Sequence, residues 1–216
     1  LSGVSKIDAV VGEEDAKDLR ESGAEETRDK VVEHVRGVRG ADVSTDQALE
    51  WIDLGGVTPS GLDSPYWTLD PIDGTKGFLR GEQYAIALGL LVDGVVVAGA
   101  LGCPNLPVDP ANPDGPQGVI FSAVRGGGTV AEPIDGGPET PVRVADTDDP
   151  AQARTCESVE KGHSSHDRSA KVAAAAGFTL DPVRIDSQAK YAAVARGEAG
   201  VYWRFARGDY REKIWD

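Results

Sequence analysis

The first two thirds of the chain consists largely of short apolar runs separated by turn residues, a pattern typical of β-strands. Apolar runs predict buried strands at 7–11 and 66–70. Longer runs predict two hairpins, one turning at Asp93–Gly94 and one at 126–128. A further strand at 140–146 completes an antiparallel set.

Two segments of this part show helical periodicity instead. The segment 31–38 places its valines on one helical face. A capping box from Ser44 to Gln47 predicts the start of a second helix, which we expect to end at Gly55. The segment 104–118 is rich in Pro, Asp and Asn and predicts a surface loop.

The pattern changes near residue 147, where predicted strands and helices begin to alternate. The strands are expected at 153–160, 182–186 and 199–205, with helices between them at 164–177 and 187–197. This β-α-β-α-β order is typical of a layered α/β unit. We therefore expect an antiparallel α+β half at 1–146 and a smaller α/β half at 147–216.

Composition restricts the partners of the protein. The 216 residues are 40% hydrophobic, enough for a sizeable core, and the formal net charge is −14. Such a surface repels nucleic acid polymers and anionic membranes, but a bound metal can reverse the local field for a small anionic ligand. We therefore expect a small-molecule partner, no nucleic acid polymer and no membrane.

Two cysteines, Cys103 and Cys156, are too few for a disulfide framework. Reduced thiols favour an intracellular compartment, the cytoplasm in the first place, with an organelle left open. Cys103 precedes Pro104 and is expected to be a small buried hydrophobe rather than a nucleophile. The chain begins with Leu and contains no Met, so we expect it to be part of a longer protein.

Carboxylates gather where predicted strands end. Glu13 follows the first strand, Asp70 and Asp73 end another, and Asp216 ends the chain. With no His or Cys beside them, these oxygen ligands favour a hard ion such as Mg²⁺ over Zn²⁺. Pro71 stiffens the backbone, which helps to aim both aspartates and the Ile72 carbonyl at one point.

The two residues after Asp73 add a candidate phosphate site to the candidate metal site, and the two together indicate phosphoryl chemistry. Gly74 and Thr75 supply backbone N–H groups at the start of a predicted short helix, which suits a phosphate group. The alternative is a simple tight turn, because Asp-Pro and Asp-Gly are common turn dipeptides. The residues alone leave both interpretations open.

The stretch "WTLDPIDGTKGFLRGEQYAIALGL" resembles the D-P-[IL]-D-G-T signature of the inositol monophosphatase-like superfamily of lithium-sensitive, magnesium-dependent phosphatases. "VVGEED" resembles its G-E-E motif and "EKIWD" its W-D motif. "DGTKGFLRGEQ", "GCPNLP", "EKGHSSHD" and "RIDSQAKY" are similar to its 3'(2'),5'-bisphosphate nucleotidase branch. The resemblance implies a layered αβαβα sandwich. The superfamily's N-terminal helical segment with its water-activating Asp, and its part beyond W-D, have no counterpart here.

The resemblance also implies roles for individual residues. Two or three Mg²⁺ ions would be held by Glu13, Asp70, Asp73, Asp216 and the carbonyl of Ile72. Catalysis would rest on Thr75 and Asp73, with Thr75 beside the attacking water. Substrate contacts would come from Gly74, Thr75, His163, Ser187, Lys190 and Arg204.

The residues of the second half carry weaker signals on their own. His163 lies in a predicted strand-to-helix loop, where either ligand contact or simple helix capping is expected. Ser187 stands at an N-cap position, so capping alone would explain it. Lys190 is more informative, because a cation in the first turn of a helix is unfavourable unless an anion is nearby. Arg80 and Glu82 are expected to be structural.

The function implied by the resemblance is hydrolysis of the 3'-phosphate of adenosine 3',5'-bisphosphate, and of its sulfated relative, by an activated water. The products would be AMP and phosphate. Two alternatives remain: a phosphatase for inositol polyphosphates, and a nucleotide-binding partial chain without catalysis.

Overall fold

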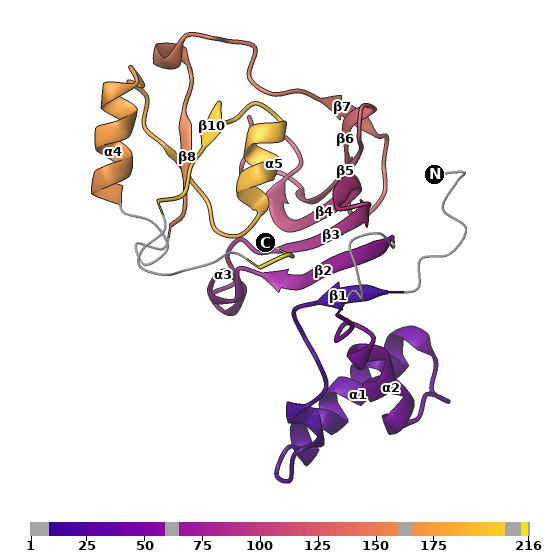
Figure 1. Cartoon of the computed structure of the whole chain (residues 1–216). Helices are drawn as coiled ribbons and strands as arrows, with labels where there is room; N and C mark the ends of the chain where they lie inside the picture. The colour runs from indigo at the N-terminus through magenta and orange to yellow at the C-terminus, as the bar shows by residue number, and fades with distance from the viewer. Residues whose placement is uncertain (1–8, 59–64, 160–165, 206–212, 216) are drawn as a thin grey trace.

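A computed structural model describes residues 9–58, 65–159, 166–205 and 213–215. Its larger sheet has seven strands in the order β1-β2-β3-β4-β5-β6-β7 (Figure 1). The strands β1 and β2 pair in parallel, and every later neighbour in this sheet pairs antiparallel. Their bounds are Val10–Gly12, Tyr66–Asp73, Ala85–Val92, Val95–Pro107, Gln117–Val124, Gly128–Pro133 and Thr140–Val142.

Both predicted hairpins are confirmed. Asp93 and Gly94, between β3 and β4, have φ angles of 51° and 72°, the left-handed conformation that a two-residue hairpin turn requires. The predicted loop at 104–118 is wrong at both ends, because β4 continues to Pro107 and β5 begins at Gln117. The pairing of β4 with β5 shifts between Cys103 and Pro107, and this irregularity accommodates the prolines within an extended strand.

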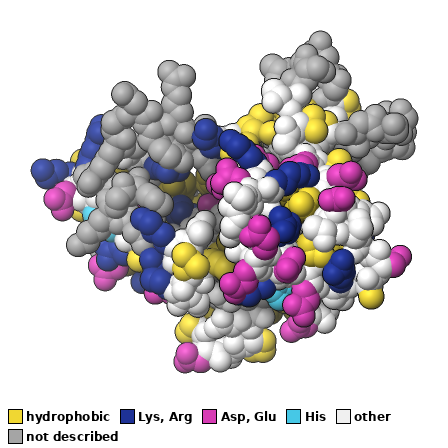
Figure 2. Space-filling model, turned by 90° about the horizontal axis from the view of Figure 1, so that it is seen from below, with side chains coloured by type: hydrophobic (Ala, Val, Ile, Leu, Met, Phe, Trp, Pro, Cys, Tyr) yellow, Lys and Arg dark blue, Asp and Glu magenta, His cyan; other side chains and the backbone are white. Residues whose placement is uncertain are grey.

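Helices α1 (Glu25–Arg39) and α2 (Thr45–Asp53), with the short 3₁₀ helix η1 (Asp18–Arg20), lie beyond the edge strand β1 (Figure 1). Ser44 caps α2 as predicted, since its side chain accepts the Gln47 N–H at 3.1 Å. Val32 is buried, but Val38 is 84% exposed, so the predicted valine face is only partly buried. Acidic and basic side chains are interspersed over this end of the molecule (Figure 2).

The smaller sheet is parallel, in the order β10-β8-β9, and follows the expected β-α-β-α-β sequence. Its elements, with a 3₁₀ helix η2 (Pro150–Gln152) before them, are β8 (Thr155–Glu157), α4 (His166–Ala175), β9 (Val183–Arg184), α5 (Ala189–Ala195) and β10 (Val201–Tyr202). No helix in the described ranges is long and apolar enough to cross a membrane.

Helix α5 lies between the two sheets and joins them into one layered α+β structure (Figure 1). One buried cluster combines Phe121 and Cys103 of the larger sheet, Cys156 of the smaller sheet, and Ala192 and Ala193 of α5. The alanines let the helix approach both sheets closely. Both cysteines are free and buried, and burial raises the pKa of each thiol to about 12. Cys103 is therefore a core residue, as predicted.

Candidate active site

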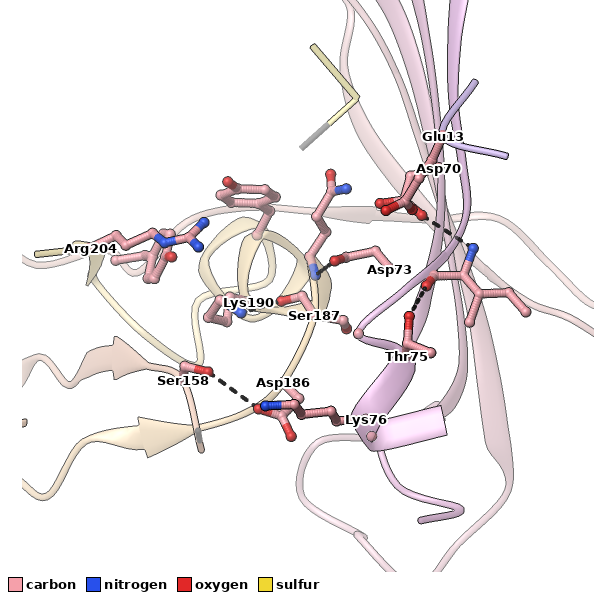
Figure 3. Close-up of a pocket in the computed structure, with 16 residues that line it drawn as sticks. Glu13, Asp70, Asp73, Thr75, Lys76, Ser158, Asp186, Ser187, Lys190 and Arg204 are labelled. Carbon is pink, nitrogen blue, oxygen red and sulfur yellow. Dashed lines mark hydrogen bonds between the residues drawn. The ribbon is translucent and has the colours of Figure 1, made fainter. Parts of the chain in front are cut away.

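A cavity of about 310 Å³ lies between the end of β2 and the start of helix α5 (Figure 3). It brings together most of the predicted site residues. Those lining it are Glu13, Asp70, Ile72, Asp73, Gly74, Thr75, Ser187, Lys190 and Arg204. His163 and Asp216 lie outside the described residues.

Glu13 and Asp70 form an acidic pair on one wall of this cavity (Figure 3). Parallel pairing places Gly12 opposite Leu69, and the Glu13 N–H donates to the Leu69 carbonyl at 3.1 Å. The residues that follow this pair, Glu13 and Asp70, therefore lie side by side at the same edge of the sheet. Asp70 is 2% exposed and accepts the Ile72 N–H at 3.2 Å. Burial, followed by the charges of Glu13 and Asp73, raises the pKa of Asp70 to about 8.

Asp73 does not complete a three-carboxylate cluster with this pair. It follows an irregularity in β2, since Asp70 pairs with Ala87 but Asp73 pairs with Ala85, one residue out of step. Its carboxylate accepts the backbone N–H of Gln188, which comes from the other half (Figure 3). Among the described residues, no group of three or more carboxylate, imidazole or thiol side chains is arranged to hold a metal. The predicted convergence is therefore only partial.

A tight turn follows these acids. Gly74 has a φ of 85° and precedes helix α3 (Thr75–Leu79). The Thr75 hydroxyl donates to the Ile72 carbonyl at 3.5 Å, so it lies close to the acidic wall. A Cβ on Gly74 would be 2.7 Å from the Ser187 Cβ, and only glycine allows this approach. The turn is thus in direct contact with the second half of the chain.

The opposite wall comes from the loop before α5 and from the helix itself. Ser187 is buried, has a φ of 63°, and accepts the Ala189 N–H on its hydroxyl at 3.2 Å. Lys190 is in the first turn, as predicted, and its ammonium group donates to the Ser187 carbonyl at 2.6 Å. Burial lowers the pKa of Lys190, although the charge of Asp73 opposes that shift.

Sequence reasoning missed several residues of this cavity, among them Lys76, Ser158, Asp186, Gln188 and Tyr202. Asp186 is 5% exposed and lies two residues after β9, and its position at the end of the predicted strand 182–186 could have indicated a site residue. Gln188 gave no such signal, because its backbone N–H and not its side chain contacts Asp73. Its side-chain amide donates to the Trp215 carbonyl at 3.0 Å.

Comparison with known proteins identifies the family. The sequence profile of the Inositol monophosphatase family matches residues 7–216. The chain belongs to the inositol monophosphatase family. Among solved structures, SuhB of Mycobacterium tuberculosis superposes with a TM-score of 0.51 at 27% identity, over 83% of this chain and 69% of that one. The expected family and layered fold are confirmed.

Curated members of the family are more similar in sequence. The 3'(2'),5'-bisphosphate nucleotidase 1 of Arabidopsis thaliana is 43% identical over 96% of this chain and 63% of its own length. The 3'(2'),5'-bisphosphate nucleotidase of Emericella nidulans is 42% identical over 97% of this chain and 66% of its own length. This chain therefore spans less than two thirds of either relative.

Proposed function

We propose that this inositol monophosphatase family member acts as a Mg²⁺-dependent phosphatase on the 3'-phosphate of adenosine 3',5'-bisphosphate and of its sulfated relative. The observation that carries the proposal is one cavity with an acidic pair on one wall and half-buried Lys190 on the other. Such a cavity suits a cation on one side and an anionic nucleotide on the other. The names of the curated relatives support the same substrate class.

The acidic pair fits a divalent cation. Glu13 and Asp70 offer hard oxygen ligands, and burial, with the neighbouring charges of Glu13 and Asp73, raises the pKa of Asp70. The Ile72 carbonyl is a third oxygen on the same wall. Asp73 would join them through Oδ1 while Oδ2 accepts the Gln188 N–H, and Asp216 is proposed from the family motif alone. When bound, Mg²⁺ supplies positive charge that stabilises phosphoryl oxygens and lowers the pKa of water.

The chain's own residues would orient the reactants. Because the Thr75 hydroxyl donates to the Ile72 carbonyl, its lone pairs are directed to accept a hydrogen bond from the attacking water. The N–H groups of Gly74 and Thr75 would donate to the phosphate that is cleaved. The Gln188 N–H would hold the Asp73 carboxylate beside this turn.

The opposite wall would bind the rest of the nucleotide. Lys190 and Arg204 line the cavity across from the acidic pair and would pair with the phosphate that is not cleaved (Figure 3). The Ser187 hydroxyl lies between them and the turn. His163 is proposed as a further nucleotide contact on the strength of the resemblance.

Phosphate release from adenosine 3',5'-bisphosphate, with Mg²⁺ and with EDTA, tests the proposal. We expect release only with Mg²⁺, strong loss in Asp70→Asn, and no loss in Asp93→Asn, an exposed hairpin aspartate that serves as the matched control. Faster release from an inositol bisphosphate would favour the inositol alternative. Nucleotide binding without release in both metal conditions would indicate a non-catalytic binding protein.

A further inference from the structure

Arg80 connects the two halves of the chain just outside the cavity. It follows helix α3, and its Nη2 donates to Asp186 Oδ2 at 2.8 Å across 106 positions of sequence. Its Nε donates to Glu82 Oε2 at 2.6 Å. The planar guanidinium thus holds one carboxylate from each half, a geometry that a lysine ammonium does not reproduce.

The partner in the second half is a buried charge. The Asp186 side chain is 7% exposed, whereas the Arg80 side chain is 37% exposed. The second Asp186 oxygen accepts the Ser158 hydroxyl at 3.3 Å. A buried carboxylate that loses its cation must rearrange to regain solvent or another partner. The Lys76 side chain also points toward Asp186 (Figure 3), so the conformation of the chain around Asp186 depends on Arg80 together with Lys76.

The two residues directly after Asp186 contact the turn at Asp73 and Gly74. Ser187 packs on Gly74, and the Gln188 N–H donates to Asp73. Helix α3 is consequently fastened at both ends to one short segment: Gly74 against Ser187 before the helix, and Arg80 with Asp186 after it.

We propose that Arg80 is a positioning residue, which fixes segment 186–188 and through it both walls of the cavity. Arg80 does not line the cavity, so its effect passes through Asp186. The consequence for catalysis rests on the proposed phosphatase function. Segment 186–188 both binds Asp73 through the Gln188 N–H and forms the cavity wall at Ser187. Loss of Arg80 should therefore change both the catalytic rate and the affinity for substrate.

The experiment compares Arg80→Ala with Arg184→Ala. Arg184 is a matched control, because its Nε pairs with a carboxylate that is also buried, Glu157, at 2.9 Å, and both residues belong to the smaller sheet. Amide hydrogen exchange at Gln188 reports the segment without requiring activity. Steady-state kinetics on adenosine 3',5'-bisphosphate, measured as kcat and KM, show whether the cavity still binds and turns over the substrate.

For Arg80→Ala we expect about 10-fold faster exchange of the Gln188 amide. We also expect a loss of about 10- to 100-fold in kcat/KM, with kcat lowered and KM raised. Arg80→Lys should recover only part of this loss. Arg184→Ala should leave exchange at Gln188 and KM unchanged, because a merely destabilising change lowers the amount of folded enzyme and not its KM.

Unchanged exchange at Gln188 in Arg80→Ala, or a change equal to that in Arg184→Ala, would overturn the positioning role. Faster exchange with an unaltered KM in an active enzyme would overturn it as well. If the unmutated protein releases no phosphate from the nucleotide, the proposed function fails, and exchange at Gln188 alone then decides whether Arg80 positions the segment.

Discussion

Replacing Gly74 by alanine tests the contact between the two halves at its closest point. The added Cβ would lie 2.7 Å from the Ser187 Cβ and 3.3 Å from its Cα. Neither atom is the end of a flexible side chain, so the clash cannot be relieved by a rotamer change. Gly81 is a matched control, since it has a φ of 70° and no atom within 4 Å of its would-be Cβ.

Both substitutions place alanine in a left-handed conformation, but only Gly74→Ala also causes a steric clash. Alanine in a left-handed conformation costs about 1–2 kcal/mol at either position. Overpacking adds about 1–3 kcal/mol only at Gly74. The gain from a less flexible unfolded chain is common to both and cancels in the comparison. We therefore expect Gly74→Ala to lower the free energy of unfolding by about 1–3 kcal/mol more than Gly81→Ala does.

Urea unfolding, followed by circular dichroism, measures both values. The reasoning predicts that Gly74→Ala has the lower urea midpoint by a margin that reflects the Ser187 clash alone. Equal midpoints for the two variants would refute it, because they would show that Ser187 does not pack against Gly74.

Three further predictions concern the cavity. Thr75→Ala should lower kcat by about 100-fold with little change in KM, because the water contact matters in the transition state; a normal kcat with a raised KM would assign Thr75 to binding. Lys190→Ala should raise KM for adenosine 3',5'-bisphosphate by about 10-fold and leave KM for a simple phosphate ester unchanged; equal effects on both would remove the nucleotide assignment. In EDTA, Asp70→Asn should raise the Tm by an amount that grows from pH 4 to pH 8. Asp70 has a pKa of 3.8 in the unfolded chain and of about 8 in the folded protein, so the unmutated protein loses stability as the pH rises through this range. A Tm difference independent of pH would contradict the buried acidic pair.

Local signals predicted most of the fold. Asp93–Gly94 specifies its own hairpin, and Ser44 with Gln47 specifies a helix start, because both depend on neighbouring residues only. The continuation of β4 to Pro107 depends instead on pairing with β5, and the exposure of Val38 depends on what α2 covers. Neither can be deduced from the periodicity of one segment.

In the site as well, features that depend on neighbouring residues could be predicted, whereas those set by distant residues could not. Glu13 and Asp70 were predicted to lie together because each stands at a strand end. The half at 1–146 was expected to be antiparallel, and it is the parallel pairing of β1 with β2 that brings the two ends to one edge. The direction of Asp73 could not be predicted, since it is set by a backbone N–H 115 positions away. Ser187 was expected at an N-cap, whereas the structure assigns the N-cap to Gln188 and places Ser187 in a left-handed conformation. Arg80, expected to be structural, gains its importance from the distant Asp186.

The most direct test of the metal-site proposal is the Mg²⁺ dependence of thermal unfolding, measured for the protein, Asp70→Asn and the control Asp93→Asn. Mg²⁺ at about 100 times its Kd should stabilise the protein and Asp93→Asn by about 2.7 kcal/mol and raise their Tm. Asp70→Asn should start from a higher Tm in EDTA and gain little from Mg²⁺. An equal Mg²⁺-induced rise in all three proteins, or none in any of them, would contradict a magnesium site at Glu13 and Asp70.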